Sequence, residues 1–281
     1  NIEILVSDNC STDDTWDIVQ EFAARDPRIK AYRQTHNVGM VKNTKTTLHM
    51  ASGEFIMGAS GNDYWAPSFV SACVAELFRG PSVVLAYPKA LYMDLEGNAI
   101  GPIRTNLDTR GMGVVSRVNV VLWGLGDYYQ MCGLFRRGLW DSCEHKAVLA
   151  PDGLFLTQAA LQGSFAQIPD TLFHKRLAAK DMGKGVAFKR LCDESGVPIE
   201  LGPDQLYYEM MREYVTLVKT HFPPGLERNA LISSIVLAMA TRHRANLQGE
   251  SRAAAGAPPA PVRGDLEGII ERFASEFDDL L

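Results

Sequence analysis

The chain lacks the features that mark three large classes of protein. No apolar run approaches the roughly 18 residues that a membrane-spanning helix needs, so no such helix is expected. The five cysteines form no C-x-x-C pair and are odd in number, which argues against a disulfide framework or a zinc site and favours a reducing compartment. Lysine and arginine are scattered rather than striped, and the net charge is −5, so no nucleic-acid partner is expected.

What is present is ordinary for a globular protein. The chain has 281 residues, of which 46% are hydrophobic and 22% charged, enough for one large domain or one domain with an appendage. With this charge balance, an anionic ligand has to be held locally by a metal ion, by helix N-termini or by single basic residues.

The first 80 residues alternate short apolar runs with helical patterns. Strands are expected at residues 2–6, 29–33 and 54–58, each followed by a helix. Such alternation is typical of βαβ units and a largely parallel sheet. Because parallel crossovers are right-handed, the loops that follow the three strands should gather along one edge of the sheet. These loops carry Asp8, Asn37 and Asp63.

The loop Ser60–Asp63 is the strongest candidate for chemistry. It follows the apolar strand of residues 54–58 and precedes Pro67, which suits the first turn of a helix continuing to Arg79. In open α/β sheets, ligands bind at the carboxyl ends of the strands. The alternative is that Asp63 only turns the chain or caps the helix.

The remaining sequence divides near residue 176. Strands are expected at 82–87, 128–135 and 164–168, helices at 114–125 and 152–162, and a hairpin-like turn at 94–98. Later helical patterns cover 205–221, 226–247 and 265–281, and a linker rich in Ala, Pro and Gly covers 249–264. We therefore predict an α/β domain at 1–176 and a helical extension at 177–281.

Several motifs in order resemble family 2 glycosyltransferases. The run Glu3-Ile4-Leu5-Val6-Ser7-Asp8 to Thr15 is similar to the first nucleotide-binding loop of that family, and Ser60 to Pro67 lies where its Asp-x-Asp-type loop belongs. The remaining matches are Asn37-Val38-Gly39, Asn43, Ala51 to Ile56, Gly133 to Arg137, and Asp152 with Gly163 eleven residues on. The resemblance covers residues 2–176, and the ordered set is more specific than any one motif.

The resemblance implies a GT-A fold of the α/β class, with a mostly parallel central sheet flanked by helices. It implies transfer of a sugar, with inversion, from a nucleotide-diphosphate sugar to a glycan, lipid-linked or polysaccharide acceptor. Residue by residue, it implies that Asp8 binds the base, Asn37 and Asn43 shape the nucleotide pocket, Asn62 faces the ribose or metal, Asp63 binds the metal, and Asp152 is the catalytic base. The chemistry agrees, because a leaving diphosphate needs positive charge and inversion needs a base on the opposite face of the sugar.

Each assigned residue also has a simpler structural interpretation. Asp8 and Asn37 are common turn residues, Asn43 could be an exposed helix residue, and Asp152 could be an N-cap. Arg136 and Arg137 are read as surface ion-pair formers, with pyrophosphate binding as the alternative. His174 is read as structural, with late metal ligation as the alternative.

The sequence departs from the family in two places. Members commonly have Asp where this chain has Ser60 and Asn62, so affinity for a divalent cation (Mg²⁺ or Mn²⁺) should fall and depend more on the diphosphate itself. Members also begin with a strand–helix unit that precedes the equivalent of Ile2–Val6. We therefore expect about 30 to 45 further residues upstream, on the scale of one βαβ unit.

Two other functions remain open, together with the surroundings of the protein. The chain could be a catalytically impaired binding or interaction module, or a nucleotidyltransferase, although the Gly-rich basic loop expected of the latter is missing. A cytoplasmic location is expected, with a peripheral position at the inner face of the membrane as one option. The apolar stripe of Tyr207, Met211, Tyr214 and Val218 suits packing on the catalytic domain, a homodimer contact or a membrane-surface contact.

Overall fold

The computed structural model describes residues 1–124, 126–143, 148–177, 192 and 203–243. The strands are β1 (Ile4–Asp8), β2 (Ile29–Arg33), β3 (Phe55–Met57), β4 (Tyr64–Trp65), β5 (Val83–Met93), β6 (Ala99–Pro102), β7 (Leu134–Arg136) and β8 (Ser164–Arg176). The helices are α1 (Thr15–Arg25), α2 (Met40–Met50), α3 (Phe69–Arg79), α4 (Val114–Gly124), the 3-10 helix η1 (Tyr129–Cys132), α5 (Arg137–Ser142), α6 (Pro151–Gln162), α8 (Pro203–His221) and α9 (Leu226–Arg242). The linker at 249–264 and the helix at 265–281 lie outside the described residues.

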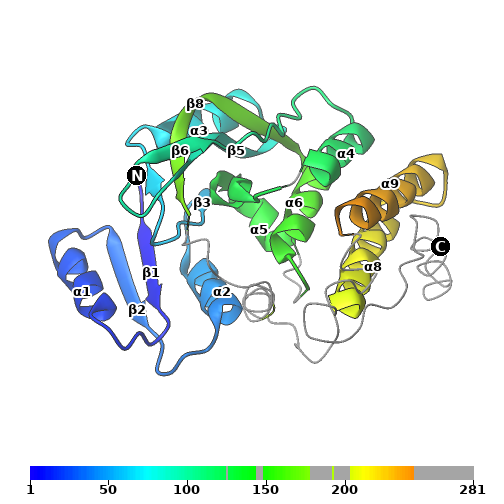
Figure 1. Cartoon of the computed structure of the whole chain (residues 1–281). Helices are drawn as coiled ribbons and strands as arrows, with labels where there is room; N and C mark the ends of the chain where they lie inside the picture. Colours follow the sequence, from blue (N-terminus) through cyan, green and yellow to red (C-terminus); the bar gives the residue numbers. More distant parts are fainter. Residues whose placement is uncertain (125, 144–147, 178–191, 193–202, 244–281) are drawn as a thin grey trace.

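The strands form two sheets. Strands β1 and β2 pair in parallel, and the six-stranded sheet has the order β3-β7-β5-β8-β4 with β6 paired to β5. In Figure 1 the β1–β2 unit with α1 and α2 lies on one side of the molecule, the larger sheet lies in the middle, and α8 and α9 lie on the other side. Glu3 Oε1 joins the two sheets by accepting hydrogen bonds from the backbone N–H groups of Ser52 (2.6 Å) and Gly53 (3.1 Å), just before β3.

The predicted mixture of strands and flanking helices is confirmed, but the strand directions are not. Besides β1–β2, only the β5–β8 pair of the described strands is parallel, and β3, β4, β6 and β7 join the larger sheet antiparallel. The βαβ pattern covers the first 80 residues, but only β1 and β2 of this part form a parallel pair. Strands β3 and β4 join the larger sheet instead, where they pair antiparallel with β7 and β8, and an alternating sequence pattern does not reveal such pairings with later strands.

The strand expected at 128–135 is wrong over most of its length. Tyr128 has a left-handed φ of 57°, and residues 129–132 form η1, so that only Leu134–Arg136 pairs as β7. Gly133 follows the turn where the chain presses against β5. A Cβ atom there would lie 2.6 Å from the Leu85 side chain and 2.9 Å from the Ala86 carbonyl oxygen. A short apolar run does not distinguish a strand from such a buried turn.

Strand β8 is much longer than the predicted 164–168. It continues through Pro169 to Arg176 because the register shifts there: Pro88 pairs with Ile168, whereas Lys89 pairs with Thr171. The two extra residues, Pro169 and Asp170, bulge out, and Pro is tolerated at such a position because no ladder donor is lost. This extension carries β8 past β4 to the Ser60–Asp63 loop.

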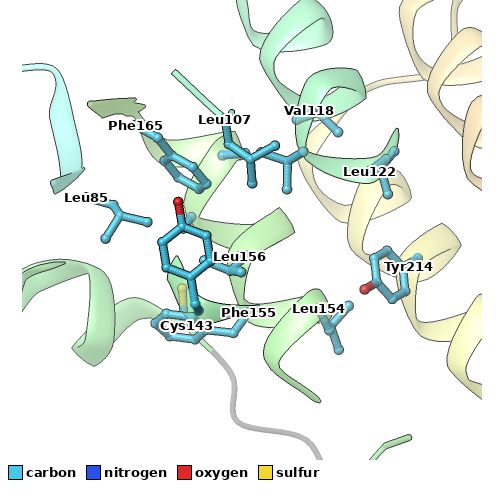
Figure 2. Close-up of a cluster of buried hydrophobic side chains, with 14 of the residues drawn as sticks. Leu85, Leu107, Val118, Leu122, Cys143, Leu154, Phe155, Leu156, Phe165 and Tyr214 are labelled. Atoms are coloured by element: carbon cyan, nitrogen blue, oxygen red, sulfur yellow. The ribbon is translucent and has the colours of Figure 1, made fainter. Parts of the chain in front are cut away.

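One continuous hydrophobic core runs from α3 through the larger sheet and α6 to α8 and α9. Figure 2 shows part of it, with Leu85 and Phe165 of the sheet next to Leu156 of α6. Helix α6 packs on β5 and β8, α4 packs on α6, and α8 and α9 pack on these helices. By contrast, α1 has no buried residue, and β1 has only β2 as a neighbour among the described strands. Within the described ranges, no helix is long and apolar enough to cross a membrane.

Candidate active site

Side-chain hydrogen bonds connect the loop after β1 to the loop after β2. The Asn9 side chain donates from Nδ2 to Asn37 Oδ1 (2.8 Å) and accepts at Oδ1 from the Val38 N–H (2.9 Å). Asn37 Oδ1 also accepts from the N–H of Gly39, whose φ of 83° is in the region that favours glycine. The predicted proximity of the Asp8 and Asn37 loops is therefore confirmed. Asn37 acts as a turn residue here, and its role toward a nucleotide stays a prediction.

Asp8 is buried at the end of β1 and its charge is compensated. Its carboxylate lies 3.1 Å from Arg33 Nε and accepts from the Ser11 N–H at 3.2 Å. The bond to the Ser11 N–H matches the simpler interpretation of Asp8 as a turn residue, but a carboxylate has further lone pairs and can accept another hydrogen bond. Its role in binding a base stays a prediction.

Asn43 ties α2 to β1. Its Nδ2 donates to the Ser7 carbonyl oxygen (2.8 Å), and its Oδ1 accepts from the Ser7 hydroxyl (2.6 Å) and from Gln34 Nε2 (3.1 Å). The alternative of an exposed helix residue is wrong, because the side chain is half-buried and bonded on both sides of its amide. Whether the same amide also lines a nucleotide pocket stays a prediction.

Asp63 is held by the end of β8. Its Oδ1 accepts from the backbone N–H of Arg176 (2.9 Å), and its Oδ2 lies 2.6 Å from the Ser60 hydroxyl. That hydroxyl is also 2.8 Å from Asn62 Oδ1 and, with a single proton, donates to one of the two at a time. The N-cap position of helix α3 is Ser68, five residues after Asp63, so the helix-cap interpretation of Asp63 is wrong. Each carboxylate oxygen keeps lone pairs for a cation.

The Arg176 side chain fixes the rest of this loop. Its Nε donates to the Asn62 carbonyl oxygen (2.9 Å), and its Nη1 donates to the Asp94 carbonyl oxygen (3.2 Å) in the β5–β6 turn. The backbone and side chain of one residue thus hold both Asn62 and Asp63. This contact was not predicted from the sequence, because the strand was expected to end at residue 168.

An ion pair that the sequence did not indicate lies beside this loop. Lys175 Nζ donates to the carboxylate of Asp127 and to its carbonyl oxygen (3.2 Å), and the Tyr92 hydroxyl donates to Asp127 Oδ2 at 2.5 Å. Burial, and then the bond to the carboxylate, raise the pKa of Tyr92 to about 12. Asp127 lies in an irregular segment, and only the full length of β8 brings Lys175 to it.

The pKa of the Cys132 thiol depends on the charged side chains around it. Its pKa is raised to about 12, first by burial and then by the negative charges of Asp63, Asp152 and Asp127, while Lys175 opposes the shift. Two of the predicted site residues, Asp63 and Asp152, therefore lie close enough to act on the same thiol. Within the described ranges, no three His, Cys, Asp or Glu side chains converge closely enough to hold a metal ion by themselves.

Asp152 is exposed in the first turn of α6. The N-cap position is Ala150, which has a left-handed φ of 50°, and Pro151 begins the helix, so the N-cap interpretation of Asp152 is wrong. Gly153 follows, and a Cβ there would lie 2.5 Å from the Tyr214 hydroxyl of α8. Figure 2 shows Tyr214 pointing from α8 toward Leu154 in the same turn. The helical extension therefore contacts the turn that carries Asp152.

The two arginines after β7 have structural partners. Arg136 Nε donates to the Val83 carbonyl oxygen (2.8 Å), and its Nη2 donates to the Leu77 carbonyl oxygen near the end of α3. Arg137 donates to the carbonyl oxygens of Ala51 and Gly53 after α2. Arg136 is thus no surface ion-pair former. Cationic side chains commonly bind the free carbonyl groups at helix C-termini in this way.

The surroundings of His174 match its structural interpretation. The His174 ring packs against Tyr64, with ring centroids 5.2 Å apart, across the β4–β8 pair.

Comparison with known proteins gives a family match and partial relatives. A model described as Glycosyl transferase family 2 matches residues 1–142. An uncharacterized protein of Mycobacterium tuberculosis is 37% identical over 89 residues, which cover 31% of this chain and 25% of that protein. Chondroitin synthase of Escherichia coli is 31% identical over 100 residues, which cover 36% of this chain and 14% of the synthase. The matches thus span a quarter or less of these relatives.

A solved structure is similar over most of the chain. The crystal structure of S. aureus TarS 1–349 in complex with UDP-GlcNAc gives a TM-score of 0.59 at 16% identity, covering 88% of this chain and 70% of that one. A likeness at this level of identity concerns the fold.

Proposed function

Since the chain belongs to glycosyltransferase family 2 and has the GT-A fold of the α/β class, we propose that it moves a sugar from a nucleotide-diphosphate sugar to a glycan, lipid-linked or polysaccharide acceptor with inversion. That it is a glycosyltransferase follows from the family. The donor class is supported by the UDP-GlcNAc bound in TarS, and the acceptor class by chondroitin synthase. The observations that carry the proposal are the family match over residues 1–142 and the single carboxylate of the Ser60–Asp63 loop, which the Arg176 N–H holds in place.

The donor end of the site is assigned to three loops. We assign Asp8 to the base of the nucleotide, and Asn37 and Asn43 to the shape of the nucleotide pocket. We assign Asn62 and Asp63 to the ribose and the diphosphate. A divalent cation (Mg²⁺ or Mn²⁺) would supply positive charge to the leaving diphosphate. Asp63 fits such an ion through its remaining lone pairs, and the diphosphate oxygens have to complete the ligand set because Ser60 and Asn62 replace acids.

The acceptor end is assigned to Asp152. Asp152 is exposed in the first turn of α6, where the N-terminal end of the helix favours a negatively charged side chain. Asp152 would take the proton of the acceptor hydroxyl as its oxygen attacks the anomeric carbon and the bond to the diphosphate breaks. With Asp63 on the leaving-group side and Asp152 on the attacking side, the sugar would lie between them, and its configuration would invert.

Calorimetry and turnover of three variants test this proposal. Wild type should bind UDP or GDP more tightly with Mg²⁺ or Mn²⁺ than with EDTA, and Asp63→Ala should abolish that metal dependence. Asp152→Asn should bind as wild type but release nucleotide from labelled nucleotide sugars, with a polysaccharide extract as acceptor, about 10²- to 10⁴-fold more slowly. The matched control is Asp170→Asn in the exposed β8 bulge. Unchanged turnover in Asp152→Asn would remove it as the base.

The same experiment separates the alternatives. Ser60 and Asn62 favour a catalytically impaired nucleotide-binding module, as does the finding that no three acidic, His or Cys side chains of the described residues could hold a metal ion together. Such a module would bind nucleotide without any turnover. A nucleotidyltransferase would release pyrophosphate from a nucleoside triphosphate.

The organisation and surroundings of the enzyme are also proposals. We assign residues 1–176 to the catalytic domain and 177–281 to a helical extension that packs against α6 through Tyr214. A cytoplasmic location, with the extension as homodimer contact or at the inner membrane face, is tested by cell fractionation and by light scattering.

A further inference from the structure

Lys175 is a cation placed among three carboxylates. Its charge acts on the Cys132 thiol together with those of Asp63, Asp127 and Asp152, and it is the positive one among them. The β4–β8 register pairs Tyr64 with His174 and Trp65 with Phe173, so one further step brings Asp63 opposite Lys175. The next residue, Arg176, binds Asp63 through its backbone N–H. Lys175 therefore lies on the strand segment beside the loop assigned to the diphosphate, with its ammonium group bound to Asp127.

The ammonium group of Lys175 is held in one orientation and still has a hydrogen-bond donor to offer. Asp127 accepts from it through both its carboxylate and its carbonyl oxygen, and Tyr92, which is paired with Lys175 across β5 and β8, holds the other carboxylate oxygen. A lysine ammonium group has three N–H donors, and in the described part of the chain that of Lys175 has two acceptors, both on Asp127. The Lys175 side chain is 31% exposed, which leaves a path for a ligand.

We propose that Lys175 donates to the diphosphate of the bound nucleotide sugar, and that Asp127 and Tyr92 hold its ammonium group in position for this contact. The inference rests on the proposed function and adds a phosphate-binding residue and two positioning residues to it. It also explains why the Ser60–Asp63 loop can have a single carboxylate. A more acidic loop would bind a metal ion more tightly, and here the fixed ammonium group supplies part of the positive charge that such an ion would provide. By donating this hydrogen bond, Lys175 stabilises the negative charge of the departing diphosphate.

Titration of UDP and GDP into full-length variants tests the proposal, with Mg²⁺ and, separately, with EDTA. Lys175→Met should weaken binding of whichever nucleotide wild type prefers by about 10- to 100-fold, the range of a hydrogen bond between charged groups. The loss should persist in EDTA, and Lys175→Arg should recover part of it. Lys89→Met is the matched control, since Lys89 is exposed on the neighbouring strand β5.

The double variant Lys175→Met/Asp127→Asn separates ligand contact from a structural ion pair. It removes both charges together, so neither is left buried alone, and thermal unfolding shows that it folds. Affinity that stays low in the double variant supports the contact with phosphate. Wild-type affinity in Lys175→Met, or its recovery in the double variant, overturns the inference while the proposed function stands. If wild type itself binds neither UDP nor GDP, the proposed function has failed and the inference falls with it.

Discussion

At the scale of single residues, the loop Ser60–Asp63 combines one carboxylate with two neutral oxygen donors. The Ser60 hydroxyl lies within hydrogen-bond distance of both Asn62 and Asp63, an arrangement that two adjacent carboxylates would change by repulsion unless a cation were bound. The neutral residues therefore suit a loop that keeps its shape without metal. They also lower its attraction for a divalent ion, which prefers charged oxygen ligands.

The substitution Asn62→Asp should make the loop depend more on a bound metal ion. A second carboxylate should strengthen metal-dependent binding of UDP or GDP by about tenfold, or roughly 1.4 kcal/mol, while binding in EDTA weakens through repulsion of the diphosphate. Calorimetry with and without Mg²⁺ measures both effects. Asn106→Asp is the control, because it adds the same charge at an exposed turn and keeps the bond from the Asp108 N–H. Equal affinities for Asn62→Asp and wild type in Mg²⁺ would place the cation away from this loop.

At the scale of elements, the sequence predicted best where helical periodicity is long and strands are bounded by turns. Helices α3, α4 and α6 agree with their expected ranges within one or two residues, and the β5–β6 hairpin turns at 94–98 as expected. The turn at 128–133 and the full length of β8 were missed because they depend on tertiary contacts. Gly133 lies against the side chain of Leu85, and β5 holds β8 through a bulge at Pro169.

The contact between α6 and α8 gives an element-scale prediction. Gly153→Ala would place a Cβ 2.5 Å from the Tyr214 hydroxyl and 3.1 Å from the Tyr128 ring, so these side chains or the elements that carry them must shift. We expect a loss of about 1–3 kcal/mol in the free energy of unfolding, measured with urea, because buried overpacking costs that much. Turnover should fall more than nucleotide affinity, since Asp152 is the neighbouring residue. Gly138→Ala in α5 has open space around its Cβ and should be neutral or stabilising.

At the scale of the whole molecule, the site residues divide between two differently packed parts. Asp8, Asn37 and Asn43 belong to the β1–β2 unit, where α1 buries no residue, whereas Asp63 and Asp152 belong to the part built around the continuous core. The sequence motifs predicted site residues in both parts, because the motifs are local. They could not point to the Lys175–Asp127 pair, whose members are 48 residues apart and meet only through the folded sheet.

The helical extension should make the stability of the molecule depend on pH. His243 ends α9 with its ring stacked on Tyr207 of α8 at 4.5 Å, and burial, followed by the charge of Arg242, lowers the pKa of His243 to about 4. The folded state therefore prefers the neutral ring, whereas the unfolded chain takes up a proton near pH 6.5. The contribution of His243 to the free energy of unfolding is therefore fully present above pH 6.5. It declines as the pH falls toward 4, by about 3 kcal/mol at most.

His243→Phe keeps a ring on Tyr207 and removes the titration. Its free energy of unfolding, measured with urea at steps between pH 7 and 4, should decline less steeply than that of wild type over this interval. His36→Phe, at an exposed turn, should follow the wild-type profile. Parallel profiles for His243→Phe and wild type would mean that the His243 ring is equally accessible to protons in the folded and unfolded states, and that the packing of α9 on α8 does not depend on its neutral form.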